Sequence, residues 1–193
     1  MNIYFHSYIT TKAAGMKSLD KVFAYAMDQE TTPVYVADYA RKVLDFQTLA
    51  VARTATGWRV RGAKDLRTIR IPAAMGVPDL QKSEEIAGFN AHQGEVYTHL
   101  SDDSAELVLT QTPTALAHLV SVNGRIEKFE SSPRGGRWNI KANVPLKFTL
   151  ADVQSCQVSV AGRPLKAKRR AGGLSFFEIS DHVARPLEAI CRG

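Results

Sequence analysis

The chain contains little cysteine, no long apolar run and no low-complexity tract. Its two cysteines, Cys156 and Cys191, match no zinc-ligand spacing. They are compatible with a disulfide in an oxidising compartment and equally with two unpaired buried thiols. No apolar stretch approaches membrane-spanning length, and the first residues lack the order of a signal peptide. Taken alone, the chain predicts a cytoplasmic protein without a membrane span, unless Met1 is an internal start in a longer, exported protein.

Common signatures of enzymes are also missing from the sequence. It contains no GxGxxG, no Walker loop, no GxSxG and no HExxH. The histidines of the C-terminal three quarters are scattered, and Asp102 and Asp103 follow one of them shortly. These histidines are His92, His99, His118 and His182. Scattered residues of this kind disfavour a metal site, so the sequence predicts no metal ligands in this chain.

The hydrophobic content and the net charge limit the classes of protein to which the chain can belong. Hydrophobic residues make up 45% of the chain, which predicts a folded globule. The formal charge of +6 is compatible with an anionic partner, because summed charge steers association. The cations are nevertheless spread along the sequence, as in Arg59, Arg61, Lys64, Arg67 and Arg70, and then Lys166, Lys168, Arg169 and Arg170. This spacing favours solvated strand faces over a nucleic-acid-binding patch.

The N-terminal part alternates between strand-like and helix-like patterns. Residues 3–5 and 33–36 have the character of buried strands. Apolar residues recur at helical spacing over roughly residues 13–29, and Asp38 is placed to cap a second, short helix. The inward face of that helix would comprise Tyr39, Val43, Leu44 and Phe46. This βαβα order predicts part of a parallel sheet or barrel whose remaining strands would lie upstream of Met1.

The sequence changes after Phe46 to short alternating segments separated by turn signals such as Asn123-Gly124 and Gly172-Gly173. The segments with strand character are residues 49–53, 58–61, 66–71, 96–100, 105–109, 119–122, 125–129, 146–150, 158–160 and 174–179. Regular short strands with tight turns predict a β-sandwich. The expected fold is therefore an α/β remnant over residues 1–46 followed by an all-β, sandwich-like domain over residues 47–193.

Several phrases of the sequence resemble PelA-like proteins, the periplasmic hydrolase/deacetylase proteins of Pel exopolysaccharide biosynthesis, which produces a biofilm matrix. The end of the family's deacetylase region is similar to residues 2–8, 11–14, 18–19, 33–39 and 42–46. The family's C-terminal β-rich region is similar to residues 57–62, 77–80 and 87–89. The resemblance spans most of the chain, and it implies that residues 1–46 are the end of a deacetylase-type barrel.

The resemblance assigns a role to His6, which follows the first expected strand. His6 matches a histidine after a late strand of the deacetylase superfamily, whose implied role is that of the general acid protonating the amine leaving group. A half-buried histidine bonded to backbone is the alternative. The superfamily's Asp-Asp pair and HxxxH metal pair are absent from this chain, so a divalent metal is implied only for the full-length deacetylase.

The resemblance thus implies the C-terminal portion of a periplasmic polysaccharide de-N-acetylase that is inactive as this chain alone. The implied partners are an amino-sugar polysaccharide and other exopolysaccharide-assembly proteins. The alternative is a non-catalytic carbohydrate-binding or assembly β-module with exposed aromatics in a groove. The aromatic side chains that could stack on sugars, or fill the core, are Trp58, Trp138, Tyr97 and Phe129. A basic nucleic-acid-binding β protein ranks third and predicts a steep salt dependence of binding.

Overall fold

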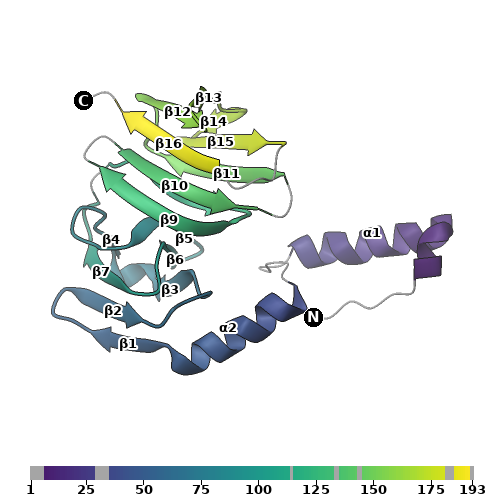
Figure 1. The fold of residues 1–193 in the computed structure, drawn as a ribbon, viewed down its shortest axis with the longest axis horizontal. Coiled ribbons are helices and arrows are strands. Elements are labelled where there is room, and N and C mark those ends of the chain that lie inside the picture. Colours follow the sequence, from purple (N-terminus) through teal and green to yellow (C-terminus); the bar gives the residue numbers. More distant parts are fainter. Residues whose placement is uncertain are drawn as a thin grey trace. The chain divides into compact units, whose positions relative to one another are not determined.

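The computed structural model describes residues 7–28, 35–113, 115–132, 135–142, 145–180 and 185–191. The chain divides into two compact units, Met1–Tyr39 and Ala40–Gly193. It is mostly β, with 51% strand and 20% helix, and its four sheets form a propeller-like arrangement (Figure 1). The expected α/β remnant followed by a sandwich is therefore wrong, and both halves of that expectation require correction.

The helical N-terminal part consists of a 3-10 helix, η1 (Ser7–Thr11), followed by α1 (Ala13–Asp28) and α2 (Val36–Thr48). The predicted helix over residues 13–29 is confirmed as α1. Gly15 allows η1 to fold back onto α1, because a Cβ at this position would lie 2.2 Å from the backbone oxygen of Ile9. Apolar spacing was thus a sufficient signal for the existence and bounds of this helix.

The βαβα unit predicted for residues 1–46 is not formed by the described residues. The first expected strand, residues 3–5, lies outside the described residues, whereas the second, residues 33–36, runs into α2 at Val36. Val36, Tyr39 and Val43 recur at helical spacing, so this stripe continues a helix rather than a strand. The expected inward face of the helix is exposed, with 61% of Tyr39 and 69% of Phe46 accessible to solvent.

One group of strands in the unit Ala40–Gly193 forms two sheets, ordered β1-β2-β7-β4 and β3-β6-β5. The strands are β1 (Ala50–Arg53), β2 (Gly57–Arg61), β3 (Thr68–Pro72), β4 (Val77–Pro78), β5 (Ile86–His92), β6 (Glu95–Leu100) and β7 (Ala105–Thr110), with a 3-10 turn, η2 (Ala73–Met75), after β3. Both sheets contribute to a single buried cluster that includes Val60, Val96, Leu100 and Leu107. These strands therefore share one hydrophobic core.

The following strands form two further sheets around a second core. Their orders are β14-β15-β11-β8 and β13-β12-β16-β10-β9. The strands are β8 (His118–Val122), β9 (Arg125–Ser132), β10 (Gly135–Lys141), β11 (Leu146–Ala151), β12 (Cys156–Val160), β13 (Arg163–Pro164), β14 (Arg169–Ala171), β15 (Leu174–Ile179) and β16 (Arg185–Cys191). Trp138, Ile140, Leu150 and Leu187 are fully buried between them, each at most 1% exposed.

The single sandwich predicted for residues 47–193 is wrong because the strands build four small sheets and two separate cores. Alternation of apolar and polar residues located many strands correctly, including β15, whose bounds are the predicted residues 174–179. It does not determine pairing, and here β2 pairs with the distant β7 and β10 pairs with the distant β16. Gly135 and Gly136 begin β10.

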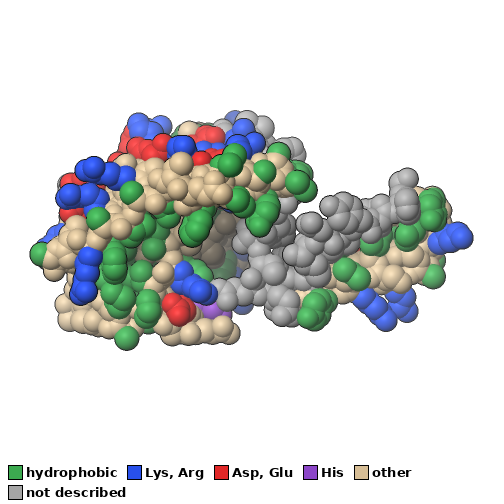
Figure 2. Space-filling view, turned by 90° about the horizontal axis from the view of Figure 1, so that it is seen from below, with side chains coloured by type: hydrophobic (Ala, Val, Ile, Leu, Met, Phe, Trp, Pro, Cys, Tyr) green, Lys and Arg blue, Asp and Glu red, His purple; other side chains and the backbone are tan. Residues whose placement is uncertain are grey.

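An ion-pair network holds α2 to the β structure through Asp65. The Asp65 carboxylate accepts from Arg41 of α2 at 3.2 Å and from Arg125 of β9 at 2.7 Å. The backbone N–H of Asp65 donates to the buried carboxylate of Asp45, and Lys42 donates to the Asp65 backbone oxygen. These contacts fix the C-terminal part of α2 although its apolar residues remain exposed. Hydrophobic side chains reach the surface on the face of the molecule that Figure 2 views.

Cys156 and Cys191 lie opposite each other on β12 and β16 and form a disulfide. The two alternatives left open by the sequence are thereby decided in favour of pairing. No helix within the described ranges is long and apolar enough to cross a membrane.

Candidate binding groove

An open groove of about 450 Å³ lies over the sheet formed by β8, β11, β15 and β14, which we call the groove sheet. It is lined by Ser121, Val122, Asn123, Lys147, Phe148, Thr149, Lys168, Phe176, Phe177 and Glu178. Phe148 and Phe177 border the groove, but their side chains are only 2% and 4% exposed and pack with Leu150 into the second core on the opposite face of the sheet. The groove therefore occupies the face of the sheet that points away from that core, and its volume is in the range of ligand sites.

The adjacent Phe176 and Phe177 of β15 divide between the core and the groove. Successive side chains on a strand point to opposite faces, so two neighbouring phenylalanines cannot both be buried in one core. Phe177 is 4% exposed and stacks on Phe148, with ring centroids 5.0 Å apart. Phe176 is only partly buried and lines the groove. Local strand geometry therefore places one aromatic ring at the surface.

A first row of side chains crosses the groove sheet through the strand register. Thr149 on β11 is the partner of both Ser121 on β8 and Phe176 on β15, and Phe176 is in turn the partner of Arg169 on β14. The Ser121 hydroxyl donates to the Thr149 hydroxyl at 3.0 Å. The guanidinium carbon of Arg169 lies 4.2 Å from the centroid of the Phe176 ring, a cation–π geometry. Four adjacent strands give this row a length of about 14 Å.

A second row, one pleat along, carries the charges of the groove. Lys147 is the register partner of Glu178, and the Lys168 ammonium lies 2.6 Å from the Glu178 carboxylate. The hydrogen bond from Lys168, followed by its charge and that of Lys147, lowers the pKa of Glu178, which therefore stays ionised at neutral pH. Asn123 is held in place, because it accepts from the Lys147 backbone N–H at 2.7 Å and donates to the Pro145 oxygen at 3.0 Å.

The aromatic residues proposed from the sequence do not line this groove. Trp138 is 0% exposed in the core, and Phe129 stacks beside it with ring centroids 5.3 Å apart. Trp58 packs against the other core, and Tyr97 is a partly buried residue of β6. Phe176 is the aromatic residue of the groove that the sequence reasoning missed. The Phe-Phe pair within a predicted strand was the signal that could have identified it.

The histidines do not assemble a catalytic or metal centre in the part of the chain that the structure describes. His6, the candidate general acid, and His182 lie outside the described residues. His92 is exposed on β5. No group of three or more His, Cys, Asp or Glu side chains that could hold a metal occurs among the described residues.

His99 and His118 have structural positions at the junction of the two cores. His99 Nε2 lies 2.8 Å from the backbone oxygen of Val120, and His118 Nδ1 lies 2.7 Å from that of Leu116. His118 also stacks on Phe89 with ring centroids 4.5 Å apart. Burial is the main cause of the lowered pKa of both histidines. Both rings therefore favour the neutral form in the folded protein.

Comparison with known proteins adds no family to this description. No family model matches the chain, and no curated protein and no solved structure matches it. The resemblance to PelA-like proteins accordingly remains a prediction from sequence phrases.

Proposed function

We propose that the unit Ala40–Gly193 is a non-catalytic carbohydrate-binding module. In this proposal a sugar polymer binds in the groove described above. The observation that carries the proposal is the first row of the groove, in which Phe176 is in register with Thr149, whose hydroxyl accepts a hydrogen bond from Ser121 on the next strand. A sugar ring has an apolar face and a rim of hydroxyls. It can therefore stack on the phenylalanine while exchanging hydrogen bonds with neighbouring polar groups.

The polar groups of the groove are already held in place by hydrogen bonds within the protein, and this favours ligand binding. The Ser121–Thr149 hydrogen bond and the two bonds of the Asn123 side chain fix these groups before a ligand arrives. Preorganisation reduces the entropy lost when a ligand binds. The groove is open rather than enclosed, as a site for part of a long polymer must be.

The disulfide between Cys156 and Cys191 supports a location in an oxidising compartment, of which the periplasm is one. The amino-sugar polysaccharide and the deacetylase role of His6 rest on the sequence resemblance, and His6 lies outside the described residues. The groove therefore carries the proposal without them.

Affinity electrophoresis through gels containing soluble polysaccharides tests the proposal. The panel should hold a neutral, an acidic and a partially N-acetylated amino-sugar polymer. We expect at least one polymer to retard the chain, and Phe176→Ala to abolish the retardation by removing the stacking ring. Phe46→Ala is the matched control, because it removes an exposed phenylalanine of α2 that is not part of the groove. Migration unaffected by every polymer, or equal retardation of wild type and Phe176→Ala, would refute the proposal.

A further inference from the structure

A basic segment of the chain, residues 153–177, borders the groove. It contains no aspartate or glutamate and five cations: Arg163, Lys166, Lys168, Arg169 and Arg170. All five side chains are exposed. Arg163 lies on β13 and Arg169 and Arg170 lie on β14, whereas Lys166 and Lys168 lie in the connection between these two strands.

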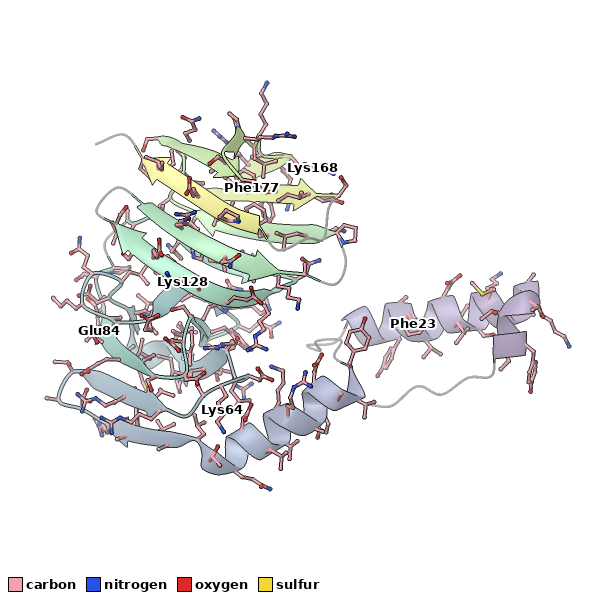
Figure 3. The ribbon with its side chains drawn as sticks, viewed as in Figure 1. Phe23, Lys64, Glu84, Lys128, Lys168 and Phe177 are labelled. Atoms are coloured by element: carbon pink, nitrogen blue, oxygen red, sulfur yellow. A yellow bond between two sulfur atoms is a disulfide. The ribbon has the colours of Figure 1, made fainter. Side chains whose placement is uncertain are left out.

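The register places this charge at the edge of the groove sheet. β14 is the edge strand beside β15, with Arg169 opposite Phe176 and Arg170 opposite Ser175. The Lys168 backbone N–H donates to the Phe176 oxygen at 2.8 Å, and the Lys168 side chain lines the groove. Figure 3 shows Lys168 beside the strand that carries Phe177. Lys168 and Arg169 therefore lie next to the proposed stacking ring, whereas Arg170 is in register with the buried Ser175 and so lies on the opposite face of the sheet.

Acidic side chains compensate little of this charge. Glu178 pairs with Lys168 at 2.6 Å, whereas Arg163, Lys166 and Arg170 form no ion pair with an acidic side chain in the described ranges. At the groove itself, Lys147, Lys168 and the adjacent Arg169 lie near one carboxylate, Glu178. These three cations and one carboxylate leave a net charge of +2 there, out of the formal +6 of the whole chain. Such a concentration favours an anionic ligand.

We propose that the polymer held in the groove is an acidic polysaccharide whose sugars carry carboxylates. This inference rests on the proposed carbohydrate-binding function. The guanidinium of Arg169 lies over the Phe176 ring, and a guanidinium group binds a carboxylate in a bidentate manner. Lys147, which lines the groove on β11, attracts a further acidic unit of the same polymer. Single-stranded nucleic acid fits the groove less well, because it stacks on successive exposed aromatic rings. Of the three phenylalanines that border the groove, Phe148 and Phe177 are buried and Phe176 alone is partly exposed.

The test compares the binding of polygalacturonate, dextran, partially N-acetylated chitosan and single-stranded DNA at low and moderate salt. We expect polygalacturonate to bind about tenfold more tightly than dextran or chitosan, with an affinity that falls as salt rises. The double variant Lys147→Glu/Arg169→Glu should weaken polygalacturonate binding about tenfold and weaken dextran binding by much less. The control Arg53→Glu/Lys141→Glu makes the same change in net charge at exposed positions away from the groove, and it should retain the wild-type affinity.

The outcomes separate this inference from the proposed function. Equal binding of acidic, neutral and amino-sugar polymers, still abolished by Phe176→Ala, would overturn the acidic preference and retain the carbohydrate groove. Binding of none of the polysaccharides would overturn both. DNA bound as tightly as polygalacturonate and unaffected by Phe176→Ala would also overturn the inference, because the basic surface would then act without the groove.

Discussion

The indole Nε1 of Trp138 donates a hydrogen bond of 3.0 Å to the backbone oxygen of Ala87. Trp138 belongs to β10 and Ala87 to β5, and both residues are 0% exposed. The bond therefore connects a strand of the second core to a strand of the first. His99 on β6 makes a second connection of this kind to the Val120 oxygen on β8. The two cores are joined through buried polar contacts, whose loss leaves unpaired groups.

Trp138→Phe should lower the free energy of unfolding by about 1–3 kcal/mol, because it leaves the Ala87 carbonyl unpaired and opens a small void. Trp58→Phe is the matched control, since the indole of Trp58 is partly exposed. Urea denaturation followed by circular dichroism measures both losses. Equal losses for the two variants would mean that the Trp138 bond adds nothing to the stability.

Gly88→Ala should destabilise the protein by about 2 kcal/mol or more. Gly88 has φ of +153°, and a Cβ there would lie 2.0 Å from the Leu119 backbone oxygen. Gly94→Ala is the control for backbone strain, because Gly94 also has a positive φ, +80°, but a Cβ would meet nothing within 4 Å. Thermal unfolding of both variants isolates the effect of the close approach between β5 and β8. A Tm for Gly88→Ala at or above that of Gly94→Ala would contradict the predicted destabilisation by this close approach.

Stability should fall on mild acidification because of His99 and His118. Burial lowers the pKa of each below the ordinary value of 6.5, so the folded state resists protonation while the unfolded state accepts a proton. The contribution of the two neutral histidines to the free energy of unfolding is fully present above pH 6.5. It is lost as the pH falls from 6.5 towards the lower pKa of the folded state. The slope is roughly 1.4 kcal/mol per pH unit for each histidine within that window.

Urea denaturation at several pH values measures this slope. The double variant His99→Gln/His118→Gln should flatten it, whereas His92→Gln, at an exposed position, should leave it unchanged. An unaltered slope in the double variant would assign the pH dependence to other groups.

Reduction of the Cys156–Cys191 disulfide should lower the free energy of unfolding by about 2–4 kcal/mol, since the bond closes a loop with a sequence separation of 35. The oxidised chain should show no reactive thiol after denaturation, because both of its cysteines are paired. A Cys156→Ser/Cys191→Ser variant should have the stability of the reduced protein and should not respond to reductant. Two thiols titrated in the untreated protein would show that the pair is open.

Local patterns in the sequence predicted local structure well. Helical spacing located α1, and alternation between turn signals located β15 although the Phe176–Phe177 pair interrupts it. Of the pattern over residues 33–36, the structure describes Tyr35 and Val36, and there the strand prediction misled, because β-branched and aromatic residues resemble a strand wherever they occur. Val36 begins a helix here instead. Propensity is a weak guide when the same apolar residues also fit a helical stripe.

The groove could not be predicted from the sequence because it depends on register between distant strands. Ser121, Thr149 and Phe176 come into one row only after β11 has paired with both β8 and β15. A bulge between Thr149 and Leu150 shifts that register, and no turn signal marks it. The division into two cores could not be predicted either. Alternation identifies which face of a strand is buried, but it does not show which strands pair into one sheet.

The strand β16 follows the other described strands in the sequence, yet it lies between β12 and β10 within its sheet. During synthesis the ribosome delivers it after both of its neighbours, which until then present unsatisfied edges to the cell. The sheets around the first core, by contrast, draw all their strands from residues 50–110 and can close while translation continues. The nascent chain thus carries a half-finished sheet until β16 has been synthesised and has paired with both of its neighbours.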